Sequence, residues 1–171
     1  MRSPHCQRAA LLIAFLATAV PAPAVADPIH NAAHAGKPAE IRAILDKDRK
    51  AVNRANKKEH GWRPLHYAVA AGRTGVARFL IDRGADVNFV SQDSQTALLL
   101  AAQNGDLRTF KLLLAKNADP DYVTPFKRSL LHAAAGGGNR EIMAFALDRK
   151  LAVNQADRTG KTPLHVAAFY G

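Results

Sequence analysis

Apolar side chains recur at three- and four-residue spacing in four segments of the chain, which is typical of helices with one buried face. These positions are Ile41, Ile44 and Leu45; Val76, Phe79, Leu80 and Ile81; Phe110, Leu112, Leu113 and Leu114; and Ile142, Met143, Phe145 and Leu147. An alanine-rich segment precedes each block and predicts a second kind of helix with a small face, centred on Ala32, Ala68, Ala101, Ala134 and Ala167. The expected fold class is therefore all-α, with two kinds of helix in alternation.

Three classes of position repeat in one register of 33 residues. The first class is a tetrapeptide that occurs as Arg63-Pro64-Leu65-His66, Thr96-Ala97-Leu98-Leu99, Ser129-Leu130-Leu131-His132 and Thr162-Pro163-Leu164-His165. The other two classes are the glycines Gly72, Gly105, Gly138 and Gly171, and the polar residues Asn88, Asp121 and Asn154. An earlier copy of the tetrapeptide, starting at Asp27, lies 36 residues before the next, so the first unit contains a three-residue insertion. The chain is therefore a repeat array in which neighbouring units bury each other's apolar faces.

The ends of the predicted helices are marked by residues suited to them. Threonine, serine and aspartate occupy the N-cap position, and we expect the Asp27 side chain to cap the first helix. Proline follows at the first helical position of three units, and a glycine ends each alanine-rich helix. Gly84 and Asn117 end the second helices, whereas Lys150 should be mildly strained in that position. The pair Gly136-Gly137 predicts a weak helix end, or a place where the backbone of a partner could approach.

The period and three phrases resemble ankyrin repeats: Arg63-Pro64-Leu65-His66-Tyr67-Ala68, Gly84-Ala85-Asp86-Val87-Asn88 and the run from Lys161 to Ala168. The resemblance implies a solenoid of stacked helix-turn-helix units joined by short β-hairpin-like loops. It covers residues 27–171, with units at about 27–59, 60–92, 93–125 and 126–158 and a partial unit at 159–171. It also implies that the histidines at one repeat position, His30, His66, His132 and His165, tie the loops of adjacent repeats together by hydrogen bonds.

Residues 1–26 have the organisation of a secretory signal peptide, not of a repeat. Arg2 and Arg8 precede a short apolar run at 9–20, and Ala24-Val25-Ala26 forms a small-residue cleavage site. The run is too short for a bilayer core, which needs about 20 residues. We expect cleavage after Ala26 and export to the bacterial periplasm, with secretion as the alternative. No later apolar stretch is long enough to span a membrane, so no transmembrane segment is expected in the mature chain.

The composition limits the chemistry open to the chain. The one cysteine, Cys6, lies in the predicted signal peptide, so neither a disulfide framework nor a thiolate metal cluster is expected. No nucleophile motif occurs, and we expect no enzymatic activity and no cofactor. His30 and His34 are four residues apart and would share a helix face, so a metal or small-ligand site there is the alternative. No glutamate lies between them, unlike in a metallopeptidase helix.

Basic residues outnumber acidic ones by 24 to 14, which gives a formal net charge of +10. The excess gathers in a segment that also contains the insertion, as Lys47, Arg49, Lys50, Arg54, Lys57 and Lys58. This basic patch is either a solvated loop or a docking surface for an acidic protein or an anionic lipid. Nucleic acid is not an expected partner, because aromatic residues are not interleaved with these charges and the chain is expected to be exported.

Solenoids bind partners through their long concave face. Positions that vary among the inner helices, together with aromatic residues at loop tips, are the candidate partner-binding residues: Asn31, His34, Trp62, Tyr67, Phe89, Leu100, Gln103, Asn104, Phe126, Phe169 and Tyr170. Packing against the neighbouring loop is the alternative role for the loop aromatics. The favoured function is a non-enzymatic protein-binding module of the bacterial envelope, and a secreted effector is a further alternative. The chain stops within a unit at Gly171, so it is a fragment, or its last half-unit frays or pairs with another chain.

Overall fold

The structure, a computed structural model, describes residues 27–149 and 151–170. These residues form nine α-helices and one 3₁₀-helix, and no strand. In chain order the elements are α2 (Pro28–Ala35), α3 (Pro38–Lys47), η1 (Arg49–Asn53), α4 (Pro64–Ala70), α5 (Thr74–Asp82), α6 (Ala97–Gln103), α7 (Leu107–Ala115), α8 (Leu130–Gly137), α9 (Arg140–Asp148) and α10 (Pro163–Tyr170). The predicted signal peptide, Lys150 and Gly171 lie outside the described residues.

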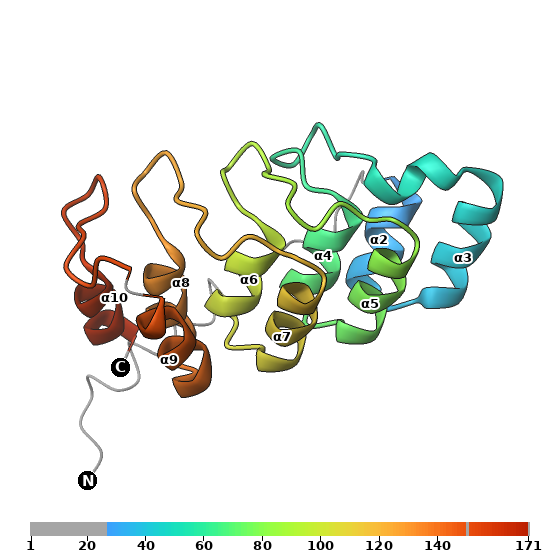
Figure 1. Cartoon of the computed structure of the whole chain (residues 1–171). Coiled ribbons are helices and arrows are strands. Elements are labelled where there is room, and N and C mark those ends of the chain that lie inside the picture. Colours follow the sequence, from blue (N-terminus) through green and yellow to red (C-terminus); the bar gives the residue numbers. More distant parts are fainter. Residues whose placement is uncertain (1–26, 150, 171) are drawn as a thin grey trace, which may run out of the picture.

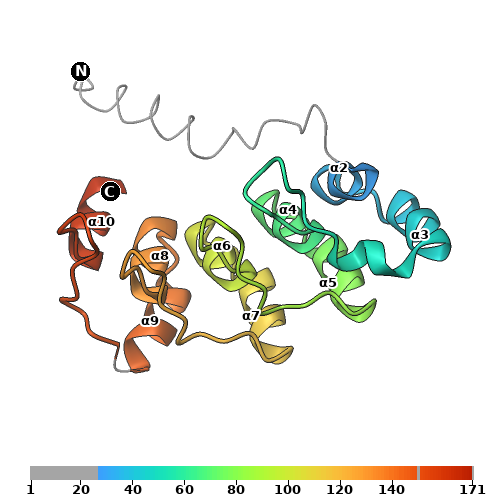
Figure 2. The same ribbon diagram turned by 90° about the horizontal axis from the view of Figure 1, so that it is seen from above.

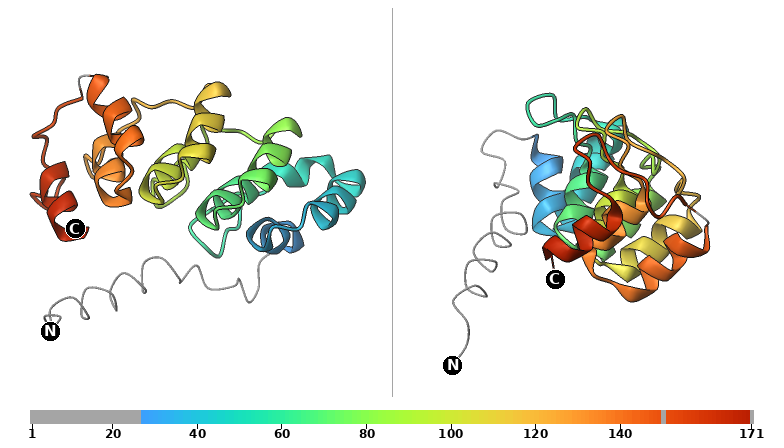
Figure 3. Two further views of the ribbon diagram at one scale, coloured as in Figure 1. Left: turned by 90° about the horizontal axis from the view of Figure 1, so that it is seen from below. Right: turned by 90° about the vertical axis from the view of Figure 1, so that its left-hand side faces the viewer.

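The helices stand in two rows that follow one another along an arc. The inner row contains α2, α4, α6, α8 and α10, and the outer row contains α3, α5, α7 and α9 (Figures 1 and 2). Connections between successive helix pairs project from one edge of the array, and the tight turns within each pair lie at the opposite edge (Figure 1). An end-on view shows these loops gathered on one side of the two rows (Figure 3). The prediction of an all-α repeat solenoid is confirmed.

Small and branched side chains from both rows form one continuous core. Ala68, Ala101 and Ala134 of the inner helices are fully buried, as are Ile41, Leu80 and Leu113 of the outer helices. Alanine on the inner helices lets these helices approach one another closely, while the larger outer residues fill the space between the rows. No helix pair could bury these surfaces alone, so each unit depends on its neighbours for stability.

Local signals at the helix ends act largely as the sequence predicts. The Thr96 hydroxyl accepts a hydrogen bond from the Leu99 amide at 3.2 Å, which satisfies one free N–H of α6. Gly36, Gly72, Gly105 and Gly138 all end inner helices with φ between 63° and 77°, a left-handed conformation that favours glycine.

Asp27 departs from the expected capping role. It occupies the N-cap position of α2, but its side chain makes no capping hydrogen bond. Its carboxylate instead pairs with the guanidinium of Arg54, which also pairs with Asp48. The prediction of a capping side chain is therefore wrong, because a nearby cation in the same unit competes for the carboxylate.

The repeated histidines connect each unit to the next. The Nε2 atom of His30 lies 2.8 Å from the Arg54 carbonyl, that of His66 lies 3.3 Å from the Gln95 carbonyl, and that of His132 lies 3.2 Å from the Lys161 carbonyl. Each acceptor is in the loop that leads to the following inner helix. The role that the ankyrin resemblance implies for these three imidazoles is thus confirmed.

The connecting loops fold back on themselves without forming strands. The amide of Ser91 donates to the Gln95 carbonyl at 3.0 Å, and equivalent bonds join Thr124 to Arg128 and Asp157 to Lys161. In the first unit the corresponding turn runs from Asn56 to Trp62 and is closed by an isolated antiparallel bridge. It spans two residues more than the other turns, so most of the insertion predicted from the sequence lies in it.

Gly137 marks a close approach between the inner helices α6 and α8. A Cβ atom built on Gly137 would lie 1.9 Å from the carbonyl oxygen of Ala102, and one built on Gly105 would lie 2.5 Å from the Gly137 oxygen. A Cβ on Gly136 would make ordinary contacts, at 3.7 Å from Val166 and Tyr170. The backbone that approaches Gly137 is therefore that of the chain's own α6, and not that of a partner.

Candidate protein-binding groove

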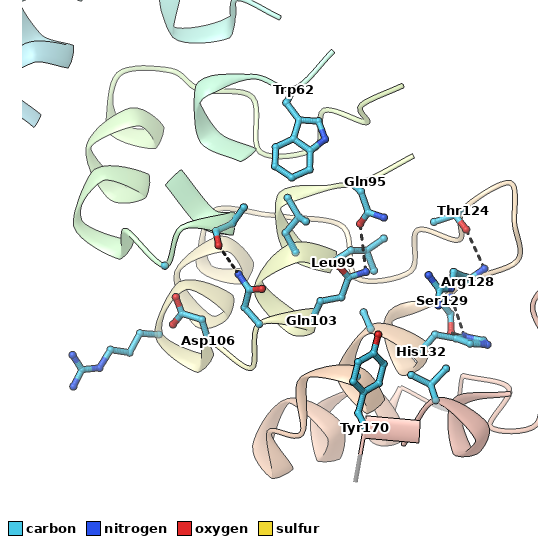
Figure 4. Close-up of a pocket in the computed structure, with 18 of the residues that line it drawn as sticks. Trp62, Gln95, Leu99, Gln103, Asp106, Thr124, Arg128, Ser129, His132 and Tyr170 are labelled. Atoms are coloured by element: carbon cyan, nitrogen blue, oxygen red, sulfur yellow. Dashed lines mark hydrogen bonds between the residues drawn. The ribbon is translucent and has the colours of Figure 1, made fainter. Parts of the chain in front are cut away.

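A groove of about 940 Å³ runs across the concave side of the inner helices. Its apolar floor consists of Leu99 and Leu100 from α6, Ala133 from α8 and Val166 from α10. Trp62 and Tyr170 lie on opposite sides of Leu99 and Gln103 (Figure 4). Such a combination of apolar floor and aromatic boundaries suits the side chains of a bound partner.

Amide side chains border this floor and are partly occupied within the fold. The Asn104 side chain donates to the carbonyls of Val69 and Ala70 at 3.2 Å, and so ties α6 to α4. Gln103 donates to the Gln95 side chain at 3.5 Å, a weak contact that leaves donors and acceptors of both amides open toward the groove. These groups could form hydrogen bonds with a ligand backbone.

The longer turn of the first unit forms one end of the groove. Trp62 is half-buried there, and its indole N–H lies 3.1 Å from both carboxylate oxygens of Asp93 in the next loop. Its ring meets Tyr67 edge-on, with centroids 5.4 Å apart. The alternative considered for this residue, packing against the neighbouring loop, therefore holds, although Trp62 still lines the groove.

Tyr67 is not a surface residue, contrary to the sequence prediction. Only 1% of it is exposed, because the longer turn covers it. Its hydroxyl donates to Glu59 Oε2 at 2.6 Å and accepts from the Asn56 side chain at 2.9 Å. Burial raises the pKa of Tyr67 above its usual value. Tyr67 therefore holds the turn in place and cannot contact a partner directly.

The remaining aromatic candidates are distributed outside the groove or at its edge. Phe126 is 55% exposed in the third loop, which connects α7 to α8, and Phe169 is 63% exposed on α10, edge-on to Tyr170. Phe89 is half-buried, with the Arg63 guanidinium 3.4 Å above its ring centre. The groove thus brings together Trp62, Leu100, Gln103, Asn104 and Tyr170 of the predicted residues, while the binding role of all candidates stays a prediction.

The two histidines of the alternative metal site differ in their burial and in their hydrogen bonds. His30 is fully buried, and its Nε2 atom is engaged by the Arg54 carbonyl. His34 is half-buried and, like Asn31, does not line the groove. Across residues 27–149 and 151–170, no three His, Cys, Asp or Glu side chains are grouped as metal ligands. The geometry does not favour a metal at this position.

The basic patch extends from the end of α3 across η1 to the longer turn, outside the groove. Lys47, Arg49, Lys50, Lys57 and Lys58 are all exposed. Arg54 differs from them, because its hydrogen bond with Asp27 and the nearby Asp48 raise its pKa above the usual value. Both of the roles considered for the patch, solvated loop and anion-docking surface, fit this exposure.

Comparison with known proteins agrees with the repeat geometry. A family model described as ankyrin repeats (3 copies) matches residues 10–91 and 95–171. The chain is an ankyrin-repeat protein.

Its relatives are proteins of varied kinds, and some of them are much longer than this chain. The ankyrin-repeat chain is 30% identical over 139 residues to a transient receptor potential cation channel subfamily A member 1 homolog of Caenorhabditis elegans, a match that covers 81% of this chain and 11% of the relative. It is 32% identical over 155 residues to mouse inversin, with coverage of 85% and 14%. An ankyrin repeat protein of fowlpox virus is 35% identical over 108 residues, with coverage of 63% and 74%. The chain therefore corresponds to a small part of the first two relatives.

Two groove residues of the ankyrin-repeat array, Gln95 and Arg128, were not predicted from the sequence, although a periodic signal marks them. Trp62, Gln95 and Arg128 are spaced by 33 residues and end successive loops, and all three line the groove. Because framework residues follow this position directly, its recurrence looks like part of the framework. Within the described residues, none of the helices has the length and apolarity needed to cross a membrane.

Proposed function

We propose that this chain is a non-enzymatic protein-binding module whose concave groove takes up a segment of a partner protein. Ankyrin repeats generally mediate protein–protein interaction, and proteins built from them are typically non-enzymatic. The observation that carries the proposal is the groove itself, in which an apolar floor lies between Trp62 and Tyr170 and is bordered by amide groups. The contacts that hold the repeats together do not explain why these side chains are accessible to solvent.

A matched pair of variants tests this proposal. Ala70 is half-buried and lines the groove, whereas Ala43 is exposed on outer helix α3, so Ala70→Arg and Ala43→Arg make the same change on different faces. Cross-linked capture from a cell-envelope extract should enrich a protein with wild type and with Ala43→Arg, and lose it with Ala70→Arg. Thermal melting of both variants shows whether they remain folded. Equal capture by the two folded variants would refute the assignment of the groove.

We also propose that the protein acts in the bacterial envelope, in the periplasm. The support is the order of charges, apolar run and small residues in segment 1–26. Expression of the full chain in a Gram-negative host, followed by fractionation and N-terminal sequencing, tests this location. A periplasmic product that starts at Asp27 is expected. Recovery in the medium would favour the alternative of a secreted effector, and an uncleaved cytoplasmic product would contradict export.

A further inference from the structure

The acidic group at the groove, the carboxylate of Asp106, is held by hydrogen bonds within the fold. Asp106 is the N-cap residue of α7, and its carboxylate accepts from the Thr109 amide at 3.1 Å and from the Thr109 hydroxyl at 2.5 Å. The hydroxyl of Thr74 lies 3.3 Å from the same carboxylate. These donors and the positive end of the helix dipole stabilise the Asp106 carboxylate and occupy much of its capacity to accept hydrogen bonds from a ligand.

Arg108, two residues further along, is in the opposite situation. It is exposed, and no hydrogen bond or ion pair of its side chain occurs in the part of the chain that the structure describes. It lines the groove at the edge where α6 turns into α7. This edge of the groove therefore presents a cation that no group within the described fold neutralises.

A second cation borders the groove at the edge formed by the loops. Arg128 lies on the third loop, with its side chain 45% exposed and its Nε atom 3.4 Å from Asp157. Asp157 also accepts hydrogen bonds from the backbone and hydroxyl of Thr159 and from the Lys161 amide. Because a guanidinium has five N–H donors, Arg128 keeps several of them open to a ligand.

The apolar floor lies between these two cations. Leu99, Leu100 and Ala133 belong to inner helices, which cross from the loop edge to the turn edge of the array (Figures 1 and 4). A ligand that follows this path meets a cation, an apolar surface and a second cation in turn. The exposed Lys57 and Lys58, at the tip of the turn that contains Trp62, add positive charge beyond the floor.

We propose, building on the protein-binding function above, that the groove recognises an acidic segment of its partner protein. An apolar side chain of that segment lies on the floor, and carboxylates on either side of it pair with Arg108 and Arg128. Charge complementarity of this kind speeds association and selects among partners that have similar apolar content. The apolar floor and the amide border favour a peptide over an anionic lipid headgroup, which would use the charges alone.

Synthetic peptides provide a direct test of this specificity. The probes are 12-residue peptides with a leucine or phenylalanine centre, flanked by Asp and Glu, by Asn and Gln, or by Lys and Arg. Trp62 is the only tryptophan of the chain and lines the groove, so its emission reports occupancy. We expect members of the acidic set to bind and to shift this emission, with affinity that falls as salt is raised.

Charge reversal at two arginines tests whether binding depends on charge in the groove or only on the net charge of the chain. Arg108→Glu should weaken binding of the acidic peptides about tenfold or more, because it replaces attraction by repulsion. Arg78→Glu makes the same charge change at an exposed position of outer helix α5 that does not line the groove, and it should bind like wild type. Circular dichroism and melting confirm that both variants are folded.

The outcomes distinguish this inference from the function on which it rests. Equal or tighter binding of the neutral or basic peptides would overturn the acidic specificity, as would equal losses in the two charge variants. Failure of every acidic peptide to bind would also overturn it. In each case, loss of partner capture in Ala70→Arg would leave the protein-binding function in place. That function falls only if capture is unchanged in Ala70→Arg.

Discussion

The contact between α6 and α8 predicts that the same substitution changes the stability in opposite directions at two adjacent glycines. Gly137→Ala should destabilise the protein, whereas Gly136→Ala should stabilise it. At position 137 the new Cβ atom would lie 1.9 Å from the Ala102 carbonyl oxygen and 2.9 Å from the Gly105 amide nitrogen. Both obstacles are backbone atoms, so no side chain can rotate away to make room.

The magnitude follows from the separation that the extra methyl group requires. Real Cβ atoms essentially never come closer than 3.0 Å to another heavy atom, so the helices must move apart by about 1 Å. Such overpacking typically costs about 1–3 kcal/mol, while alanine in place of glycine in a helix gains about 0.5–1 kcal/mol. Gly137→Ala should therefore lower the free energy of unfolding by about 1 kcal/mol, and Gly136→Ala should raise it by about 0.5–1 kcal/mol.

Urea unfolding followed by circular dichroism measures both changes, with the wild type as reference. Amide hydrogen exchange should show the loss in Gly137→Ala concentrated in α6 and α8, because neighbouring units couple most strongly. If Gly137→Ala proves as stable as Gly136→Ala, the two inner helices do not approach each other as closely as described, and the reasoning fails.

Three further predictions concern strain, pH and a buried network. Lys127, at the tip of a loop, has a φ of 61°, so Lys127→Gly should raise the unfolding free energy by up to about 1 kcal/mol in urea unfolding; a loss would contradict this strain. Burial lowers the pKa of His66 to about 4, from 6.5 when unfolded. Because the unfolded chain binds the proton more tightly, the contribution of neutral His66 is complete above pH 6.5 and is lost as the pH falls to about 4. Between pH 6.5 and about 4, the free energy of unfolding of His66→Leu should therefore fall by about 3 kcal/mol less than that of the wild type. An unchanged pH profile would refute the lowered pKa of His66. Tyr67→Phe should cost about 1–3 kcal/mol, because it leaves the Glu59 carboxylate and Asn56 amide without their shared partner; thermal melting checks this, and an unchanged Tm would contradict it.

Recurring positions allowed much of the fold to be predicted from the sequence. The units share local solutions, such as a left-handed glycine after the inner helix in four of them and a buried histidine in three, so the period shows which residues belong to the framework. His30, His66 and His132 illustrate this, because the bonds they make to the next loop recur with the repeat.

Features that occur in only one unit were harder to predict. Tyr67 occupies a position that varies among units, which suggested a surface role, but the insertion folds over it. The Gly136-Gly137 pair looks like a weak helix end, although Gly137 is required by the backbone of another unit. In both cases the deciding contact is made by a residue distant in the sequence, and comparison of equivalent positions cannot reveal it.

The longer first turn also makes one end of the array different from the other units. The other units resemble one another, so an elongated ligand could in principle shift along the array by one repeat and meet similar surroundings. Trp62 interrupts this equivalence at one end, since the turn that carries it is braced by Glu59 and by the bond from the Gln92 amide to the His60 carbonyl. A chain bound in the proposed groove would therefore meet one distinct end, set by an insertion of three residues, and this end would fix its alignment.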